Sequence, residues 1–133
     1  MSDTTYFLQI PGAQLESIEQ DGDEITLHFS EVRLIQEMEN AFEDSLWTQA
    51  VNLKIRSAET EGKLPDAPCE LTGGELIDNI YTWRGQVPLP INWQGDVSCT
   101  FKPDGADSGF TISGDAMQLE QVGHPRYIRH MKK

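Results

Sequence analysis

The chain has 133 residues, a hydrophobic content of 38% and a net charge of −12. This length suits a single domain, residues 1–133, with one core, and the composition is that of a folded globular protein. No apolar run approaches the ~20 residues of a membrane-spanning helix, and no signal peptide is recognisable at the N-terminus. We therefore expect a cytoplasmic protein without membrane contact.

The charge is distributed unevenly along the chain. Residues 1–123 hold all 22 acidic and 6 basic residues, a balance of −16, whereas residues 124–133 hold 4 basic residues and no acid. The acidic part should repel phosphate backbones, so a nucleic-acid partner is not expected. We expect the basic tail to lie across the acidic body or on a neighbouring subunit.

The first local signal in the chain is a hairpin. The Asp-Gly pair at 21–22 lies between two alternating runs and predicts a two-residue type I′ loop that pairs Ile18 with Ile25. Leu15 has the wrong parity for this register, which predicts a bulge near Glu16.

Residues 33–45 have two interpretations. The apolar residues Ile35, Met38, Phe42 and Leu46 have helical spacing, and good helix formers separate them. A short helix within 33–45 is therefore one expectation, and a continued strand followed by a loop is the other.

The middle of the chain continues the strand pattern. Alternation from Trp47 to Ile55 predicts a strand, whereas the paired glycines Gly73 and Gly74 predict a turn.

Residues 81–101 alternate without interruption but are too long for one strand of a small domain. Parity predicts three-residue loops at 84–86 and 94–96, which would form a meander. Pro88 and Pro90 lack the amide hydrogen that a central strand donates. Val87–Pro90 is therefore predicted to be an edge or a polyproline-like crossing.

A further hairpin is predicted near the C-terminus. The apolar parity switches between Ile112 and Met117, which indicates a two-residue loop at 114–115. The loop 102–109 should place Phe101 opposite Phe110 and Cys99 opposite Ile112.

Together with weaker strands at Tyr6–Ile10 and Tyr127–Met131, these segments predict an all-β protein. We expect eight to ten short strands in an antiparallel β-sandwich or barrel, with at most one short helix within 33–45.

No motif indicates catalysis or a cofactor. The histidine and cysteine spacings match no metal motif, and neither nucleophile nor phosphate-binding signatures occur. Cys69 and Cys99 do not form a disulfide framework. We expect no cofactor and no metal, and an enzyme is the least supported class.

Aromatic residues near the proline-rich crossing are candidate binding residues. Trp83 and Trp93, close to Pro88 and Pro90, would form a platform for a sugar or a peptide, although strand-spaced aromatic residues are more often core.

Arg126 and Tyr127 stand out in the basic tail. They would either anchor the last strand, with the arginine buried against carboxylates, or form a ligand or partner site.

The motifs "VPLPINWQGDVSCTF" and "FTISGDAMQLEQVGHPRYIRH" resemble a group of small bacterial proteins of unknown function with a V/I-P-L-P…G…V…G…P-R-Y ending. The resemblance covers roughly the C-terminal half. It implies a bacterial cytoplasmic all-β domain and carries no catalytic residue.

We therefore expect a domain that acts by protein–protein interaction, with a homodimer as one arrangement. The alternatives are an acidic, immunity-like inhibitor of a basic partner and a β-barrel that binds a small ligand or carbohydrate.

Overall fold

The computed structural model describes residues 4–38 and 43–132, which form nine antiparallel β-strands. The strands are β1 (Thr4–Asp21), β2 (Glu24–Met38), β3 (Glu43–Arg56), β4 (Glu59–Glu61), β5 (Cys69–Asp78), β6 (Tyr81–Arg84), β7 (Gln86–Pro88), β8 (Asn92–Pro103) and β9 (Phe110–Lys132). The expectation of an all-β fold is confirmed. Four of the strands have 14 to 23 residues and are therefore longer than expected.

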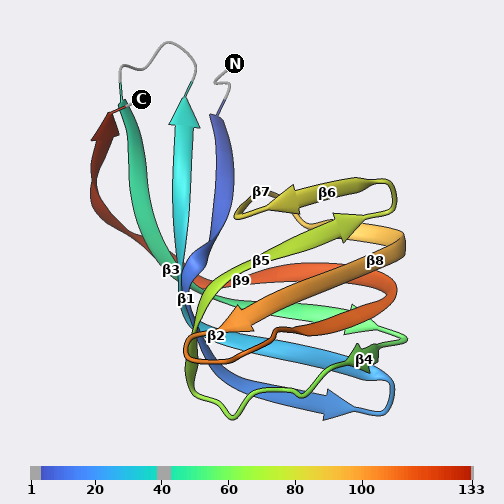
Figure 1. Ribbon diagram of the computed structural model, residues 1–133. Helices are drawn as coiled ribbons and strands as arrows, with labels where there is room; N and C mark the ends of the chain where they lie inside the picture. The colour runs from blue at the N-terminus through green and yellow to red at the C-terminus, as the bar shows by residue number, and fades with distance from the viewer. Residues whose placement is uncertain (1–3, 39–42, 133) are drawn as a thin grey trace.

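Six of the strands close into a barrel (Figure 1). Pairing runs from β1 through β2, β3, β9, β8 and β5 and returns to β1, where Leu15 lies opposite Cys69. The segment between β6 and β7 completes this seam: the Gly85 amide donates to Gly74 at 3.2 Å, and its carbonyl accepts from Ile10 at 2.7 Å. The turn residue expected at Gly85 thus joins two strands of the barrel wall.

The core fills the inside of this barrel with alternate residues of the wall strands, as a pleated sheet requires. On β2 and β3 these residues are fully or almost fully buried, and they are Ile25, Leu27, Phe29, Val51, Leu53 and Ile55. Phe101 packs edge-on against Phe29 and Phe110, with ring centroids 6.2 and 6.0 Å apart.

Four of the strands extend beyond the barrel as an arm (Figure 1). The arm comprises residues 4–9 of β1, 32–38 of β2, 43–49 of β3 and 126–132 of β9. The pairing register shifts in every strand pair at the base of the arm, which marks a line of bulges across the sheet. Bulges bend strands, so this line turns the arm away from the barrel.

Two glycines with positive φ angles lie in this line of bulges. Gly12 in β1 has a φ of +91° and Gly123 in β9 has a φ of +71°. Side chains rarely tolerate these angles, whereas glycine adopts them without steric cost. The bend therefore has a direct origin in the sequence.

The helix expected within 33–45 is wrong for the residues that the structure describes. Residues 33–38 belong to β2 and residues 43–45 to β3, and residues 39–42 lie outside the described part. Pairing across the sheet places Ile35 opposite Leu46 and buries both. Non-local pairing has overridden local helix propensity.

The loops expected at 94–96 and 114–115 are also wrong, because β8 and β9 run straight through them. The two sites face each other: Gln94 pairs with Ala116 and Val97 with Gly114, so the register shifts between them. This irregularity, not a hairpin, accounts for the parity switch between Ile112 and Met117, both of which are buried.

The three-strand meander expected within residues 81–101 is wrong too. β6 pairs with β5 and β7 pairs with β1, so the two strands do not form a hairpin around residues 84–86. The paired glycines Gly73 and Gly74 lie inside β5 and not in a turn.

Other local expectations are confirmed. The register of β1 shifts between Leu15 and Ser17, which leaves Glu16 as the bulged residue. Phe101 pairs with Phe110, and Cys99 pairs with Ile112.

Two expectations hold in part. The first hairpin turns one residue later than expected, at residues 22–23, and the partner of Ile18 is therefore Leu27, two residues beyond the expected Ile25. This even shift keeps the apolar face intact. β7 ends the order of the sheet, so the part of Val87–Pro90 that it contains is an edge, as expected.

No helix in the described ranges is long and apolar enough to cross a membrane.

Candidate functional site

The arm has one covered edge and one open edge. On the β1 side, β7 pairs with Phe7–Gln9 and the Leu89 amide donates to the Tyr6 carbonyl at 2.8 Å. On the other side, β8 stops pairing with β9 at Gln118. Within the described part of the chain, residues 126–132 of β9 therefore pair with β3 alone. We call this segment the β9 edge.

The side chains of the β9 edge separate onto two faces. Tyr127 lies opposite Trp47, and His130 lies opposite Ser45. Directly opposed residues of an antiparallel pair project to one face, and the Tyr127 and His130 rings are 5.3 Å apart. We call this side the aromatic face.

Arginines occupy the opposite side of the β9 edge, which we call the arginine face. Arg126 lies opposite Thr48 and Arg129 opposite Leu46, the alternate residues of β3. Ile128 has no opposite residue on β3 and forms a bulge between the two arginines. Both arginines are exposed, and Ile128 is 48% exposed.

The two arginines form no ion pair with the residues that the structure describes. Among the residues that the structure describes, neither Arg126 nor Arg129 lies within 4.0 Å of a carboxylate, whereas His130 Nδ1 lies 3.9 Å from Glu43 Oε2. In a protein with a net charge of −12, these two cations are available to an external anion.

A hydrogen-bond network holds the aromatic face in place. The Trp47 indole donates to Ser45 Oγ at 2.9 Å and to Gln36 Oε1 at 3.2 Å, and Gln36 Nε2 donates to the Tyr6 hydroxyl at 3.0 Å. Tyr127 packs edge-on against Trp47 with ring centroids 5.4 Å apart. The network spans all four strands of the arm and fixes the position of Tyr127.

A cavity of about 370 Å³ lies at the base of the arm. Gln49, which is 6% exposed, stabilises the bulge beside it by donating to the Gly123 carbonyl at 2.9 Å. Arg126 and His124 line the cavity together with one carboxylate, Glu31. Arg126 therefore lies next to the line of bulges at the base of the arm.

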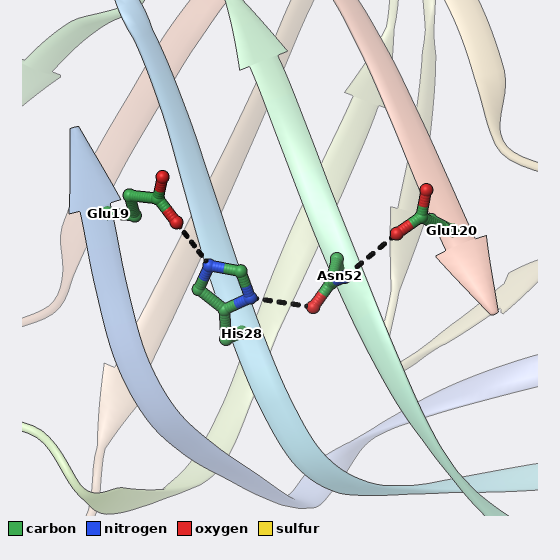
Figure 2. Close-up of polar contacts among 4 residues, drawn as sticks. All are labelled: Glu19, His28, Asn52 and Glu120. Carbon is green, nitrogen blue, oxygen red and sulfur yellow. Dashed lines mark hydrogen bonds and ion pairs between the residues drawn. The ribbon is translucent and has the colours of Figure 1, made fainter. Parts of the chain in front are cut away.

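A second polar arrangement crosses the barrel wall (Figure 2). His28 Nε2 lies 2.9 Å from Glu19 Oε1, and Nδ1 lies 2.8 Å from Asn52 Oδ1. Asn52 Nδ2 donates to Glu120 at 2.9 Å. This orientation of the amide makes Oδ1 an acceptor, so both ring nitrogens of His28 face acceptors.

The imidazolium form of His28 satisfies both contacts by donating twice. The hydrogen bond to Glu19 raises the pKa of His28 above 6.5. Neither nitrogen is free to accept a proton from a substrate, so the arrangement does not resemble a general base. We interpret it as a cross-strand link between β1, β2, β3 and β9.

The two tryptophans predicted as binding residues, Trp83 and Trp93, pack mainly against the hydrophobic core. Trp83 on β6 and Trp93 on β8 are half-buried and pack against the core cluster. Tyr81, which is 61% exposed, stacks on Trp83 with centroids 6.4 Å apart. Pro88 is half-buried on β7, and Pro90 is exposed in the following connection.

Arg126 and Tyr127 are brought into the same strand segment but onto opposite faces. Arg126 is exposed and not buried against carboxylates, so the anchoring arrangement expected for it is wrong. Tyr127 packs on Trp47. The sequence reasoning missed Ile128 and Arg129, although the concentration of positive charge in residues 124–133 was a signal for the segment.

Within the described residues, no group of three or more His, Cys, Asp or Glu side chains is placed to hold a metal ion. Comparisons with protein-family models, with curated proteins and with solved structures found no match to the chain.

Proposed function

We propose that the protein is a non-enzymatic interaction domain that binds an extended segment of a partner protein along the β9 edge. The observation that supports this most directly is the open edge of residues 126–132, which pair with β3 alone within the described part of the chain, whereas the neighbouring strands β2 and β3 are paired on both sides along most of their length. Unpaired strand edges bind peptides by adding a strand, with main-chain hydrogen bonds supplying affinity.

The rigidity of the arm supports the same proposal. A strand that is already held by neighbours loses little conformational entropy when a partner binds. β3 and the network around Trp47 hold the β9 edge in this way.

Self-association through two β9 edges finds less support. An antiparallel pair centred near Ile128, the middle of the edge, would bring Arg126 of one copy next to Arg129 of the other, at a strand spacing of about 4.8 Å. This spacing is shorter than the ~8 Å screening length at physiological salt, so the repulsion would persist.

The other expected functions also find less support. A small-ligand site at Trp83 and Trp93 is disfavoured because both indoles are half-buried and pack on the core. We propose a cytoplasmic location, which the free thiols of Cys69 and Cys99 support.

Site-specific photo-crosslinking tests the proposal. A benzophenone side chain at Ile128, on the β9 edge, is compared in cells with the same group at Ile80, which is 87% exposed at a distant hairpin turn. Ile80 is a matched control because both positions hold an exposed isoleucine and Ile80 lies outside the β9 edge.

We expect adducts at position 128 that map to one short segment of one protein. A synthetic peptide of that segment should slow amide exchange along Arg126–Met131. Adducts that are equally frequent at both positions, or a peptide that leaves amide exchange along Arg126–Met131 unchanged, would refute strand addition at this edge.

A further inference from the structure

We infer that the segment bound by the β9 edge carries two acidic residues separated by one apolar or aromatic residue. This inference rests on the proposed function and names the chemistry of the partner. The acidic side chains would meet Arg126 and Arg129, and the residue between them would meet the aromatic face.

The spacing follows from the bulge at Ile128. Arg126 and Arg129 are three residues apart in β9, but they lie opposite Thr48 and Leu46, which are two residues apart in β3. A regular strand on the free side of β9 faces the same geometry. Residues two apart in that strand would therefore lie beside the two arginines.

The residue between the two acids is directed to the other face. Side chains alternate across a strand, so this residue points to the side that carries Tyr127 and His130. Tyr127 is 48% exposed and already packed on Trp47. An apolar or aromatic side chain extends this contact, whereas a charged one would be desolvated beside the rings.

The charges favour an acidic segment. Arg126 and Arg129 have no carboxylate within 4.0 Å among the described residues, and residues 124–133 contain no acid. Opposite charges on adjacent strands stabilise a pairing, and like charges destabilise it. A basic segment would place two further cations next to these arginines.

One segment of the chain itself has part of this pattern. β4 has the sequence Glu59-Thr60-Glu61 and is exposed. Its central residue is polar and the strand has three residues, which makes it a poor occupant. Binding of β4 from a second copy would appear as concentration-dependent oligomers in sedimentation velocity, and that result would overturn the assignment to a foreign partner.

A tethered strand tests the inference. The full chain is extended at its C-terminus by a flexible linker of about ten glycine and serine residues and by seven residues in which glutamate alternates with valine. The tether gives an effective concentration in the millimolar range, so weak pairing is measurable. A second fusion replaces each glutamate by lysine. Amide hydrogen exchange of Arg126–Met131 is measured by NMR.

We expect the glutamate strand to slow exchange about tenfold more than the lysine strand, since two opposite-charge pairs replace two like-charge pairs. Arg126→Glu with Arg129→Glu should reverse this preference. The control Arg56→Glu with Lys102→Glu changes the net charge equally at exposed positions of the barrel and should leave the preference unchanged.

The outcomes separate the inference from the function on which it rests. If both strands slow exchange equally, the β9 edge accepts a strand and the acidic pattern is wrong. If neither slows exchange, the edge does not accept a strand and both proposals fail. If the control pair also reverses the preference, net charge and not the two arginines sets it, and the inference is overturned.

Discussion

Gly73 and Gly74 provide a matched pair of substitutions that tests how the barrel closes. A methyl group added at Gly74 would overlap the Thr100 carbonyl oxygen and lie 2.8 Å from the Phe101 ring. A methyl group at Gly73 would meet nothing within 4 Å. Both glycines lie in β5 with φ outside the left-handed region, so backbone conformation does not distinguish them.

The clash at Gly74 cannot be relieved easily. Thr100 pairs with Glu75 and Phe101 pairs with Gly74, so the obstructing carbonyl belongs to the paired backbone of β8. Overpacking of this kind costs typically 1–3 kcal/mol. Alanine in a strand gains about 0.5–1 kcal/mol over glycine. Because the obstructing atom is paired backbone, we expect the upper end of this cost, about 3 kcal/mol. Less the gain from alanine, Gly74→Ala should lower the free energy of unfolding by about 2 kcal/mol, and Gly73→Ala should raise it slightly.

Urea denaturation measures this difference. With a slope of about 2 kcal/mol per molar urea, Gly74→Ala should lower the midpoint by about 1 M relative to the parent, and Gly73→Ala should not lower it. Equal slopes for the three proteins would show that two-state unfolding is retained. A midpoint for Gly74→Ala at or above that of Gly73→Ala would refute the close approach of β5 to β8.

Two further predictions concern titrating side chains. Because the pKa of His28 is raised above 6.5 by Glu19, the link should stabilise the protein fully below pH 6.5 and lose its effect as the pH rises through the raised value. The loss should be a few tenths to about 1 kcal/mol for this partly exposed pair, measured by urea unfolding between pH 5.5 and 8.5; the same pH dependence in His28→Gln would contradict this origin. Burial raises the pKa of Cys99 to about 12 and also raises the pKa of the half-buried Cys69. At pH 8 Ellman's reagent should modify Cys69 slowly and Cys99 on unfolding alone; modification of both thiols at one rate in native buffer would be inconsistent with the core position of Cys99.

The sequence predicted the parts of the fold that depend on local alternation. Cys99 opposite Ile112 and Phe101 opposite Phe110 followed from parity across one loop, and the structure has both pairs. The bulge at Glu16 followed from a single residue of wrong parity. In each case the signal and its consequence lie within one pair of neighbouring strands.

The turns that were wrongly expected at glycines share a physical cause. Glycine signals both a turn and a bulge, because each needs backbone angles or space that other residues lack. Gly95 has a φ of +108° inside β8, and Gly114 sits where a side chain would overlap the Arg56 carbonyl. A turn and a bulge differ in what pairs with the chain beyond the glycine. That partner is remote in sequence, so local pattern could not distinguish them.

The sequence predicted only part of the candidate site, because the rest depends on pairing between strands that are remote in sequence. The positive charge of residues 124–133 was evident, but its position on an open edge depends on where β8 stops pairing with β9, and the residue at that point, Asn92, is remote in sequence from residues 126–132. Trp83 and Trp93 attracted attention by their type, yet the core explains their placement. Trp47, which supports Tyr127, was hidden within an ordinary strand pattern.

The charges, the proline and the bulge of the β9 edge also suit a protective role. Proteins place charges, prolines and bulges on exposed strands to prevent aggregation, and Pro125, Arg126 and Arg129 match that description. Protection requires only that such residues be present. It does not require Trp47, Ser45 and Gln36 to be hydrogen-bonded to one another beneath Tyr127, nor both arginines to lie on one face across a bulge. A fixed register of side chains on both faces is what recognition of a second strand requires, and for that reason we favour binding over protection.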